Sequence, residues 1–230
     1  MKSEAGNALF LILIAVALFA ALSYAVTSSG RGGSGIDKEQ YSIIAARMVQ
    51  HFGSMEQAIN RMKIINGCSD EEISFEHAPL DGTDTARDNP VTGDNYECFI
   101  YHSDGGGVAE IEFADFFGSS ATNTYYNAIG RNSIDGVGTT GTSTDNADLH
   151  FLVELPPEID RTEFCNIYNK GVGITVTPDD AIYGSPVFQG VYGSGGVAVV
   201  SPGDIDGQIT ACYTYSSPVR RLIYYVLIAR

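Results

Sequence analysis

The chain has 230 residues, with 28 acidic and 13 basic side chains and a formal net charge of −15. This length fits one ordinary globular domain with an appendage and excludes a large multidomain assembly. The acidic balance disfavours binding to phosphate backbones, so we expect no nucleic-acid partner. Hydrophobic residues make up 44% of the chain, which is enough to build a packed core.

The first predicted element is an uncharged apolar run from Ala8 to Val26. As a helix rising about 1.5 Å per residue, it is long enough to cross a bilayer core of about 30 Å. The run fits a cleaved secretory signal, because Ser23 and Ala25 supply small residues ahead of a mature start at Val26. It also fits an uncleaved anchor that holds a C-terminal domain outside the membrane.

A third interpretation depends on the residues before the apolar run. The segment MKSEAG followed by NALFLILIAVALFAAL resembles the start of a type IV prepilin or pseudopilin, which has a very short leader ending in glycine. The resemblance covers roughly the first 50 residues. It implies a leader of residues 1–6, cleavage between Gly6 and Asn7, and a transmembrane and filament-core helix over residues 7–29.

The resemblance also implies partners and a location. In that family the apolar helix, here from Ala8 to Val26, first lies in the inner membrane and later packs against other copies or other pilin-like subunits. The head is then periplasmic before assembly and exposed on the cell surface afterwards. The fifth residue after the implied cleavage point is Leu11, where major pilins have Glu. Because some minor subunits share this departure, the resemblance implies an accessory subunit.

An amphipathic helix is predicted for residues 37–66, after a Gly-rich hinge over residues 30–36. Asp37 stands where an N-cap is expected, and the Asn-Gly pair at 66–67 provides a stop signal. One apolar face repeats every three or four residues: Ile44, Met48, Phe52, Met55, Ile59 and Met62. This period predicts that the helix packs along one side.

Residues 67–230 are predicted to form a globular head rich in β-strands. Short apolar or alternating runs are separated by Gly, Pro, Asn and Asp, which is the pattern of strands and turns. Strands are predicted at 96–102, 107–113, 149–155, 174–177, 187–191, 196–200, 208–215 and 222–229. A helix is predicted from Pro157 or Glu158 to Lys170, ended by Gly171. The fold class predicted is therefore α+β, with the amphipathic helix packed on a mainly antiparallel sheet.

Two connections in the head are predicted from their composition. Residues 103–106 are expected to form the turn of a hairpin between the first two strands. Residues 113–149 are rich in glycine and polar side chains and are predicted to form a long loop. Its aromatic residues are interpreted as pins that hold the loop down, with a subunit contact as the alternative: Phe116, Phe117, Tyr125 and Tyr126.

Four cysteines follow the apolar run and form no C-x-x-C pair: Cys68, Cys98, Cys165 and Cys212. Their wide spacing favours disulfides in an exported domain over a zinc or redox site. Three pairings are possible, and order along the chain favours Cys68 with Cys98 and Cys165 with Cys212. Pilin-like heads often carry a disulfide near the C-terminus, so the second pair also fits the resemblance. Four reduced thiols in a cytosolic protein are the alternative.

The sequence offers little support for catalysis or cofactor binding. It contains no H-E-x-x-H, G-x-S-x-G or P-loop motif, so no catalytic residue and no cofactor are predicted. Two oxygen-rich stretches are weak calcium candidates, one with Asp145 and Asp148 and the other with Asp204 and Asp206. Solvated turns, in which Asp serves the backbone, are the alternative for both.

Together these patterns predict a structural subunit rather than an enzyme. The predicted function is that of an accessory subunit in a type IV pilus-like or type II secretion pseudopilus-like filament. The rival prediction is a membrane-anchored or secreted periplasmic or extracellular binding domain. In that case the ligand is expected in the loop from Gly118 to Asp148.

Overall fold

The computed structural model describes residues 12–21, 23, 33–76, 89–93, 95–110, 116–117, 128–139, 147–175, 188, 190, 192, 199–200, 205–216 and 219–230. The chain divides into two compact units, Met1–Gln40 and Tyr41–Arg230, which we treat separately. The second unit is α+β, with helices and a sheet whose strands are mostly antiparallel, as predicted.

In the first unit, residues 12–21 and Ser23 are helical, inside the range predicted as an apolar helix. The rest of the predicted range 7–29, and the processing residues Gly6 and Asn7, lie outside the described residues. Among the residues that are described, no helix is long and apolar enough to cross a membrane.

Helix α2 (Gly33–Arg61) begins earlier than the sequence predicts. Asp37 therefore lies inside the helix and is not its N-cap, and the part of the predicted hinge from residue 33 to residue 36 is helical. Each residue added to an existing helix gains a hydrogen bond, so the cost of about 1 kcal/mol for a glycine does not stop the helix from extending. Residues 30–32 of the predicted hinge lie outside the described residues.

The predicted end of the helix is confirmed. After Arg61 the chain makes a π-helical turn, η1 (Met62–Asn66), and then enters the left-handed region at Gly67, with φ 71° and ψ 19°. The Gly67 N–H donates to the Met62 carbonyl oxygen and closes the helix. Glycine is required there because a side chain is strained at this φ.

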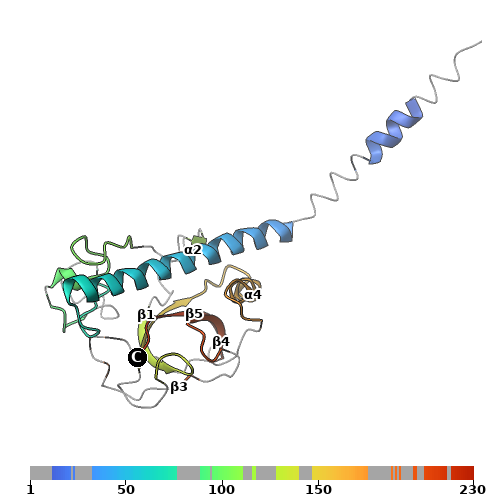
Figure 1. Cartoon of the computed structure of the whole chain (residues 1–230). Helices are drawn as coiled ribbons and strands as arrows, with labels where there is room; N and C mark the ends of the chain where they lie inside the picture. The colour runs from blue at the N-terminus through green and yellow to red at the C-terminus, as the bar shows by residue number, and fades with distance from the viewer. Residues whose placement is uncertain are drawn as a thin grey trace, which may run out of the picture. The chain divides into compact units, whose positions relative to one another are not determined.

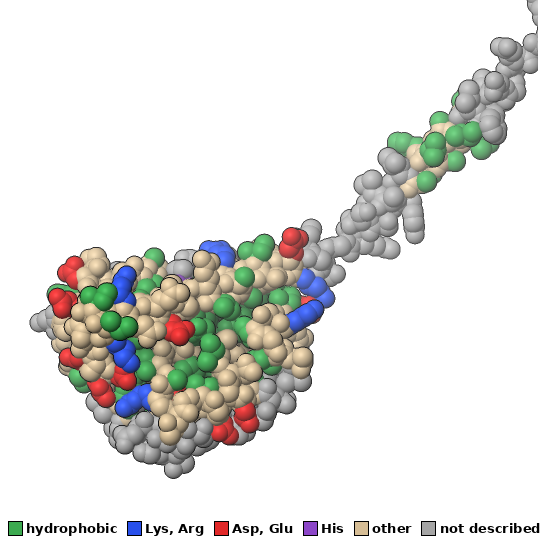
Figure 2. All heavy atoms as spheres, in the orientation of Figure 1, with side chains coloured by type: hydrophobic (Ala, Val, Ile, Leu, Met, Phe, Trp, Pro, Cys, Tyr) green, Lys and Arg blue, Asp and Glu red, His purple; other side chains and the backbone are tan. Residues whose placement is uncertain are grey.

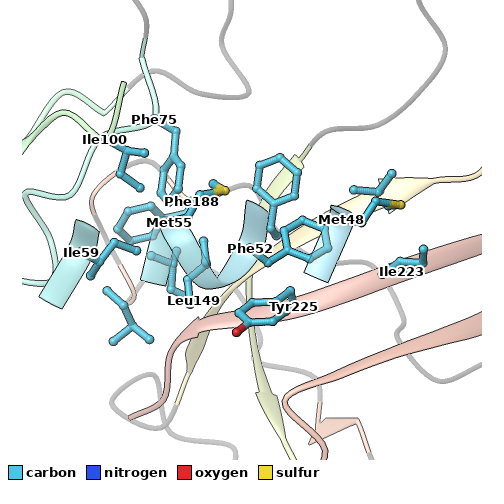
Figure 3. Packing of buried hydrophobic residues seen from close by; sticks show 14 of the residues in the cluster. Met48, Phe52, Met55, Ile59, Phe75, Ile100, Leu149, Phe188, Ile223 and Tyr225 are labelled. Atoms are coloured by element: carbon cyan, nitrogen blue, oxygen red, sulfur yellow. The ribbon is translucent and has the colours of Figure 1, made fainter. Parts of the chain in front are cut away.

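The apolar face predicted for α2 is buried in full. Ile44, Met48, Phe52, Met55, Ile59 and Met62 are all at most 6% exposed. Phe52 stacks on Tyr225 at 5.1 Å between ring centroids and contacts Phe151 at 5.8 Å. Figure 3 shows Phe52 directed toward Tyr225, with Met48 and Met55 along the same side of the helix. The helix is thus held to the sheet by large side chains.

The sheet has five strands in the order β3-β1-β2-β5-β4. They are β1 (Ala128–Ile134), β2 (Asp148–Glu154), β3 (Val199–Val200), β4 (Thr210–Ser216) and β5 (Val219–Ile228). The pairs β1–β2, β2–β5 and β5–β4 are antiparallel, and only the short β3 is parallel to its neighbour. Figure 1 shows α2 lying across this sheet.

Both faces of the central strands are buried, which explains the continuous apolar run of β5. Side chains alternate between faces: Ile223 and Tyr225 lie in the cluster that contains α2, whereas Leu222 and Tyr224 lie in a second cluster. A strand covered on both faces has no polar side to alternate with. The predicted strands at 149–155, 208–215 and 222–229 are confirmed as β2, β4 and β5 to within a few residues.

The other strand predictions turn out differently. The prediction of a strand at 96–102 is wrong: Tyr96–Cys98 is a 3-10 turn, η2, and only Phe99 bridges, to Ser74. Residues 107–110 form no strand, and neither do Ile174 and Thr175. Of the range 196–200 only Val199–Val200 is described, as β3. Apart from Phe188 and Gly190, which form no strand, the range 187–191 lies outside the described residues, as do 111–113 and 176–177.

The reversal at residues 103–106 is present without a regular hairpin. The Gly106 N–H donates to Phe99 at 2.8 Å, and the Val108 N–H donates to Ile100 at 3.0 Å. A Cβ on Gly105 or Gly106 would overlap the backbone of Phe99 or Ile100. These two positions are therefore glycine because the backbones pass too close to each other for a side chain. The adjoining disulfide and the end of the helix, and not strand partners, hold the segment.

Strand β1 lies within the range 113–149 that was predicted as a loop, so that prediction is wrong there. Its sequence, AIGRNSI, has glycine, asparagine and arginine in place of an apolar alternation. Five residue pairs with β2 hold it in the sheet. Of the predicted pins, Phe116 is buried under the Arg47 guanidinium and Phe117 packs edge-on against Phe164; Tyr125 and Tyr126 lie outside the described residues.

The second predicted helix is α4 (Arg161–Gly171), which packs on the same side of the sheet as α2. It begins later than predicted because Asp160 caps it, accepting from the Thr162 and Glu163 N–H groups at 3.1 and 3.0 Å. Gly171 remains helical, and Gly173, with φ 88°, takes the positive dihedral angle.

Two disulfides are present, and they pair the cysteines in the way that chain order favours. Cys68–Cys98 joins the end of α2 to η2, and Cys165–Cys212 joins α4 to β4. The Asn169 side chain lies one turn after Cys165 and hydrogen-bonds both the N–H and the C=O of Cys212, at 2.7 and 2.8 Å. The Asn169 amide thereby supplies the backbone of Cys212 with the hydrogen bonds that a neighbouring strand would otherwise make.

Candidate functional site

A groove of about 510 Å³ runs between α2 and residues 106–109. His51, Ser54, Ala58 and Arg61 line it from one face of the helix, because residues three or four apart lie above one another. The Arg61 Nη2 donates to the carbonyl oxygens of Gly105, at 3.1 Å, and of Gly106. The guanidinium therefore holds the opposite wall of the groove to the helix.

The titratable and hydroxyl groups of this groove are oriented by the protein itself. His51 is buried, and burial lowers the pKa of its imidazole, so the ring is neutral at pH 7. The Ser54 hydroxyl donates its proton to the His51 carbonyl oxygen at 2.7 Å. Because that proton goes to the backbone and not to the imidazole, Ser54 is not arranged as an activated nucleophile.

Only one residue of each calcium pair, Asp148 in the first and Asp206 in the second, lies in the described part of the chain. Asp148 is fully buried, whereas Asp206 is exposed; Asp145 and Asp204 lie outside the described part. In that part of the chain, no three His, Cys, Asp or Glu side chains form a group that could hold a metal ion. Asp148 instead binds protein N–H groups.

Asp148 connects the end of β1 to Arg230, two residues after the end of β5. Its two carboxylate oxygens accept from the Ile134 and Arg230 N–H groups, each at 2.9 Å. The Arg230 guanidinium lies over the Tyr192 ring at 3.9 Å and approaches Asp70 at 3.9 Å. This cluster fastens the last residues of the sheet to the segment after α2. The sequence suggested Asp148 only as a calcium ligand, because nothing in the sequence places residue 230 beside it.

Asp148 and His150 titrate in opposite directions. Burial raises the pKa of Asp148 from 3.8 to about 6, although the two N–H groups and the Arg230 charge oppose the shift. Burial lowers the pKa of His150 from 6.5 to about 4, against a contact of its Nδ1 with the Asp148 carbonyl oxygen. Between pH 4 and 6 the folded head thus holds a proton on Asp148 that the unfolded chain releases, and excludes one from His150 that the unfolded chain binds.

We therefore predict that the two groups cancel in the pH dependence of stability. In His150→Gln the contribution of Asp148 is no longer offset, so the free energy of unfolding relative to the unchanged chain should fall by about 3 kcal/mol as pH rises from about 4 to 7. In Asp148→Asn the contribution of His150 is no longer offset, and the same rise in pH should raise the free energy of unfolding relative to the unchanged chain by about 3 kcal/mol. Urea unfolding at a series of pH values measures both slopes.

The quantity to compare is the slope of the free energy of unfolding against pH, in each variant relative to the unchanged chain. The slope is used because either substitution also lowers stability at every pH. His102→Gln is the control, since His102 is partly exposed and stacks on Tyr96 at the surface. Equal slopes in His150→Gln and Asp148→Asn would show that these groups are not buried as described.

The apolar N-terminal segment is the remaining candidate element. Within residues 12–21 the large apolar side chains are between 39% and 74% exposed: Ile12, Leu13, Ile14, Val16, Leu18 and Phe19. Successive helical residues are offset by about 100°, so these side chains point in all directions around the helix axis. A helix that is apolar on every side needs an apolar environment on every side.

Sequence reasoning found the apolar segment and the cysteines, but not the groove. Its helix side comes from residues that read as the polar face of α2, and its other side is a backbone segment next to a glycine turn. Comparisons with known protein families, with curated proteins and with solved structures find no match.

Proposed function

We propose that this chain is a non-enzymatic, accessory subunit of a type IV pilus-like or type II secretion pseudopilus-like filament. The observation that carries the proposal is the exposure of apolar side chains all around the helix of residues 12–21. Either a bilayer or a bundle of like helices would bury them, and a filament subunit requires both in succession.

The second unit supports the proposal by its construction. A long helix, α2, carries an apolar face that covers the sheet, and two disulfides fasten its end and α4 to the rest. Disulfides persist in oxidising surroundings such as the periplasm or the cell surface. Such a head is suited to a location outside the cytoplasm, attached to an N-terminal apolar helix.

The absence of Glu at the implied fifth mature position supports an accessory role. In the family that the N-terminus resembles, this charge takes part in recognition between neighbouring subunits, and here the residue is Leu11. A subunit without it is better suited to a limited number of positions than to the bulk of a filament.

The first test is to determine the mature N-terminus of the protein from its native host, by intact mass and terminal peptide sequencing. Processing as a prepilin predicts a start at Asn7, with Ala8 to Val26 retained. A start at Val26 would show a secreted domain, and an intact Met1 would favour a simple membrane anchor; either result contradicts the proposal.

A second test addresses assembly directly. Leu18→Arg places a charge in the apolar helix and should abolish incorporation into filaments sheared from cells, whereas Leu18→Phe should preserve it. Both variants should keep the same protease resistance of the head. If Leu18→Arg is incorporated as well as the unchanged chain, the helix is not a filament-core element.

The groove beside α2 favours one alternative, a membrane-anchored binding domain. The loop expected to hold its ligand is only partly described, and residues 128–134 within it form β1. The groove lined by His51, Ser54 and Gly107 is the described cavity that such a ligand would use. The alternative predicts that Ala58→Phe, which fills the groove, removes binding of a ligand and leaves filament incorporation unchanged.

A further inference from the structure

Two adjacent isoleucines are exposed at the end of α2. Ile64 is 82% exposed and Ile65 is 72% exposed, whereas Met62 just before them is fully buried. Both lie in the π-helical turn η1, where each residue turns through less than the α-helical 100°. Ile65 therefore does not return to the face of Met62, where an α-helix would bring it close to the core.

The residues next to this pair contact two segments that carry acidic residues. Asn66, next to Ile65, donates from Nδ2 to the carbonyl oxygens of Glu97 at 2.7 Å and of Asp104 at 3.4 Å. Lys63, next to Ile64, pairs with Asp70 at 2.5 Å. In Figure 2, apolar, acidic and basic side chains stand together at the end of the head where Figure 1 shows α2 ending.

The surroundings of the pair are held in place and remain negative. Cys68 follows the turn by two residues, and its disulfide with Cys98 ties the turn to the segment that contains Glu97. Ser69 holds the pKa of Glu72 below its usual range by backbone and side-chain hydrogen bonds, so Glu72 stays charged. On the segments that adjoin the turn and on their ion-pair partners, five side chains are acidic, at positions 70, 71, 72, 97 and 104, and three are basic, at 61, 63 and 230, which leaves a net charge of −2.

We propose that Ile64 and Ile65, with their acidic border, form a docking surface for a protein that carries an apolar pocket bordered by Lys and Arg. Exposed large apolar residues inside a charged rim are the composition of a binding centre. A rim of one sign selects a partner of the opposite sign. A second copy of the chain, with a formal charge of −15, and an anionic membrane are both disfavoured by the same charge. The proposal does not depend on the filament role of the N-terminal helix.

The test uses the full chain in its native host with a photoreactive amino acid at position 65. Position 43 is the matched control, because Ile43 lies on the same helix and is 56% exposed. We expect a crosslinked product with one other protein from position 65 and none from position 43. Mass spectrometry of the product should place the crosslink in a peptide with apolar residues and neighbouring Lys or Arg.

Three substitutions in the crosslinking chain make the test specific. Ile64→Ser should lower the crosslink yield more than about tenfold, as for the central residue of an interface. Glu97→Gln together with Asp104→Asn should lower it several-fold and weaken its dependence on salt. Ile43→Ser should leave it unchanged. All these side chains are exposed, so the thermal unfolding midpoint should be unaffected.

Four outcomes would overturn the proposal: a product of two copies of this chain, a lipid adduct, an acidic partner peptide, or equal yields from positions 65 and 43. A mature N-terminus other than Asn7 would contradict the filament proposal and leave this result as it stands.

Discussion

Removal of residues 220–230 is expected to leave the head unfolded. These residues form most of β5, which pairs with β2 on one side and with β4 on the other. All seven side chains from Leu222 to Ile228 are at most 9% exposed. Burial of one large apolar side chain contributes about 1.5–3 kcal/mol, so the seven together contribute about 10–20 kcal/mol, which is comparable to or larger than the about 5–15 kcal/mol by which a domain is typically stable.

Near-ultraviolet circular dichroism and limited proteolysis of the truncated chain test this expectation. The control is Arg220→Ala in the full chain, which removes only the partly exposed ion pair with Glu154 at 3.2 Å and should cost at most about 1 kcal/mol. A truncated chain that keeps its near-ultraviolet spectrum and its protease resistance would refute the assignment of β5 as an interior strand of the sheet.

The second large effect is expected from Phe52→Ala, which should lower the free energy of unfolding by about 3–5 kcal/mol. Phe52 is fully buried and joins α2 to both central strands through Phe151 and Tyr225. Its removal costs the transfer energy of the ring and leaves a cavity that the helix and the sheet cannot both close. Urea unfolding under non-reducing conditions measures the change.

Gln57→Ala is the matched control, because Gln57 is exposed on the same helix five residues away and should change stability by less than about 0.5 kcal/mol. Tyr225→Phe separates packing from hydrogen bonding: it keeps the stacked ring and removes only the 2.8 Å bond to Glu56, at a cost of about 1 kcal/mol. A cost for Phe52→Ala as small as that of Gln57→Ala would mean that α2 does not pack on the sheet.

The parts predicted well are those whose signal is local and repeated. The apolar face of α2 has a period that only a helix produces, and all six of its predicted members are buried. The run LIYYVLI is apolar or aromatic at every position, which predicts a strand that is buried on both faces, and it forms most of β5. The stop at Gly67 rests on the conformational freedom of one residue and is confirmed.

The parts predicted wrongly lack such a repeated signal or have one that tertiary contacts outweigh. The apolar run YECFIYH suggested a strand, but the disulfide at Cys98 and the contacts of Gly105 and Gly106 hold it as a 3-10 turn and a single bridge. Strand β1 has no apolar alternation, so only its position beside β2 makes it a strand. Asp37 has the chemistry of an N-cap, but the helix extends past it.

For the candidate sites the division is similar. The apolar N-terminal segment and the cysteine order could be read directly, since each depends on residue type and spacing. The groove beside α2, the Asp148 cluster and the exposed Ile64 and Ile65 could not be predicted. Each depends on which residues from distant parts of the chain meet, or on the register of one π-helical turn.

The sequence by itself therefore determined the α+β class, the buried face of α2 and the central strands, and by chain order it favoured, among three possible pairings, the disulfides that the structure shows. Periodic burial and backbone freedom are properties of short segments, and a sequence displays them directly. Only the tertiary structure decided that β1 is a strand, that Asp148 serves backbone N–H groups, and that two isoleucines face solvent. Those outcomes depend on contacts between residues that are far apart in the chain. The sequence of one segment holds no information about such contacts.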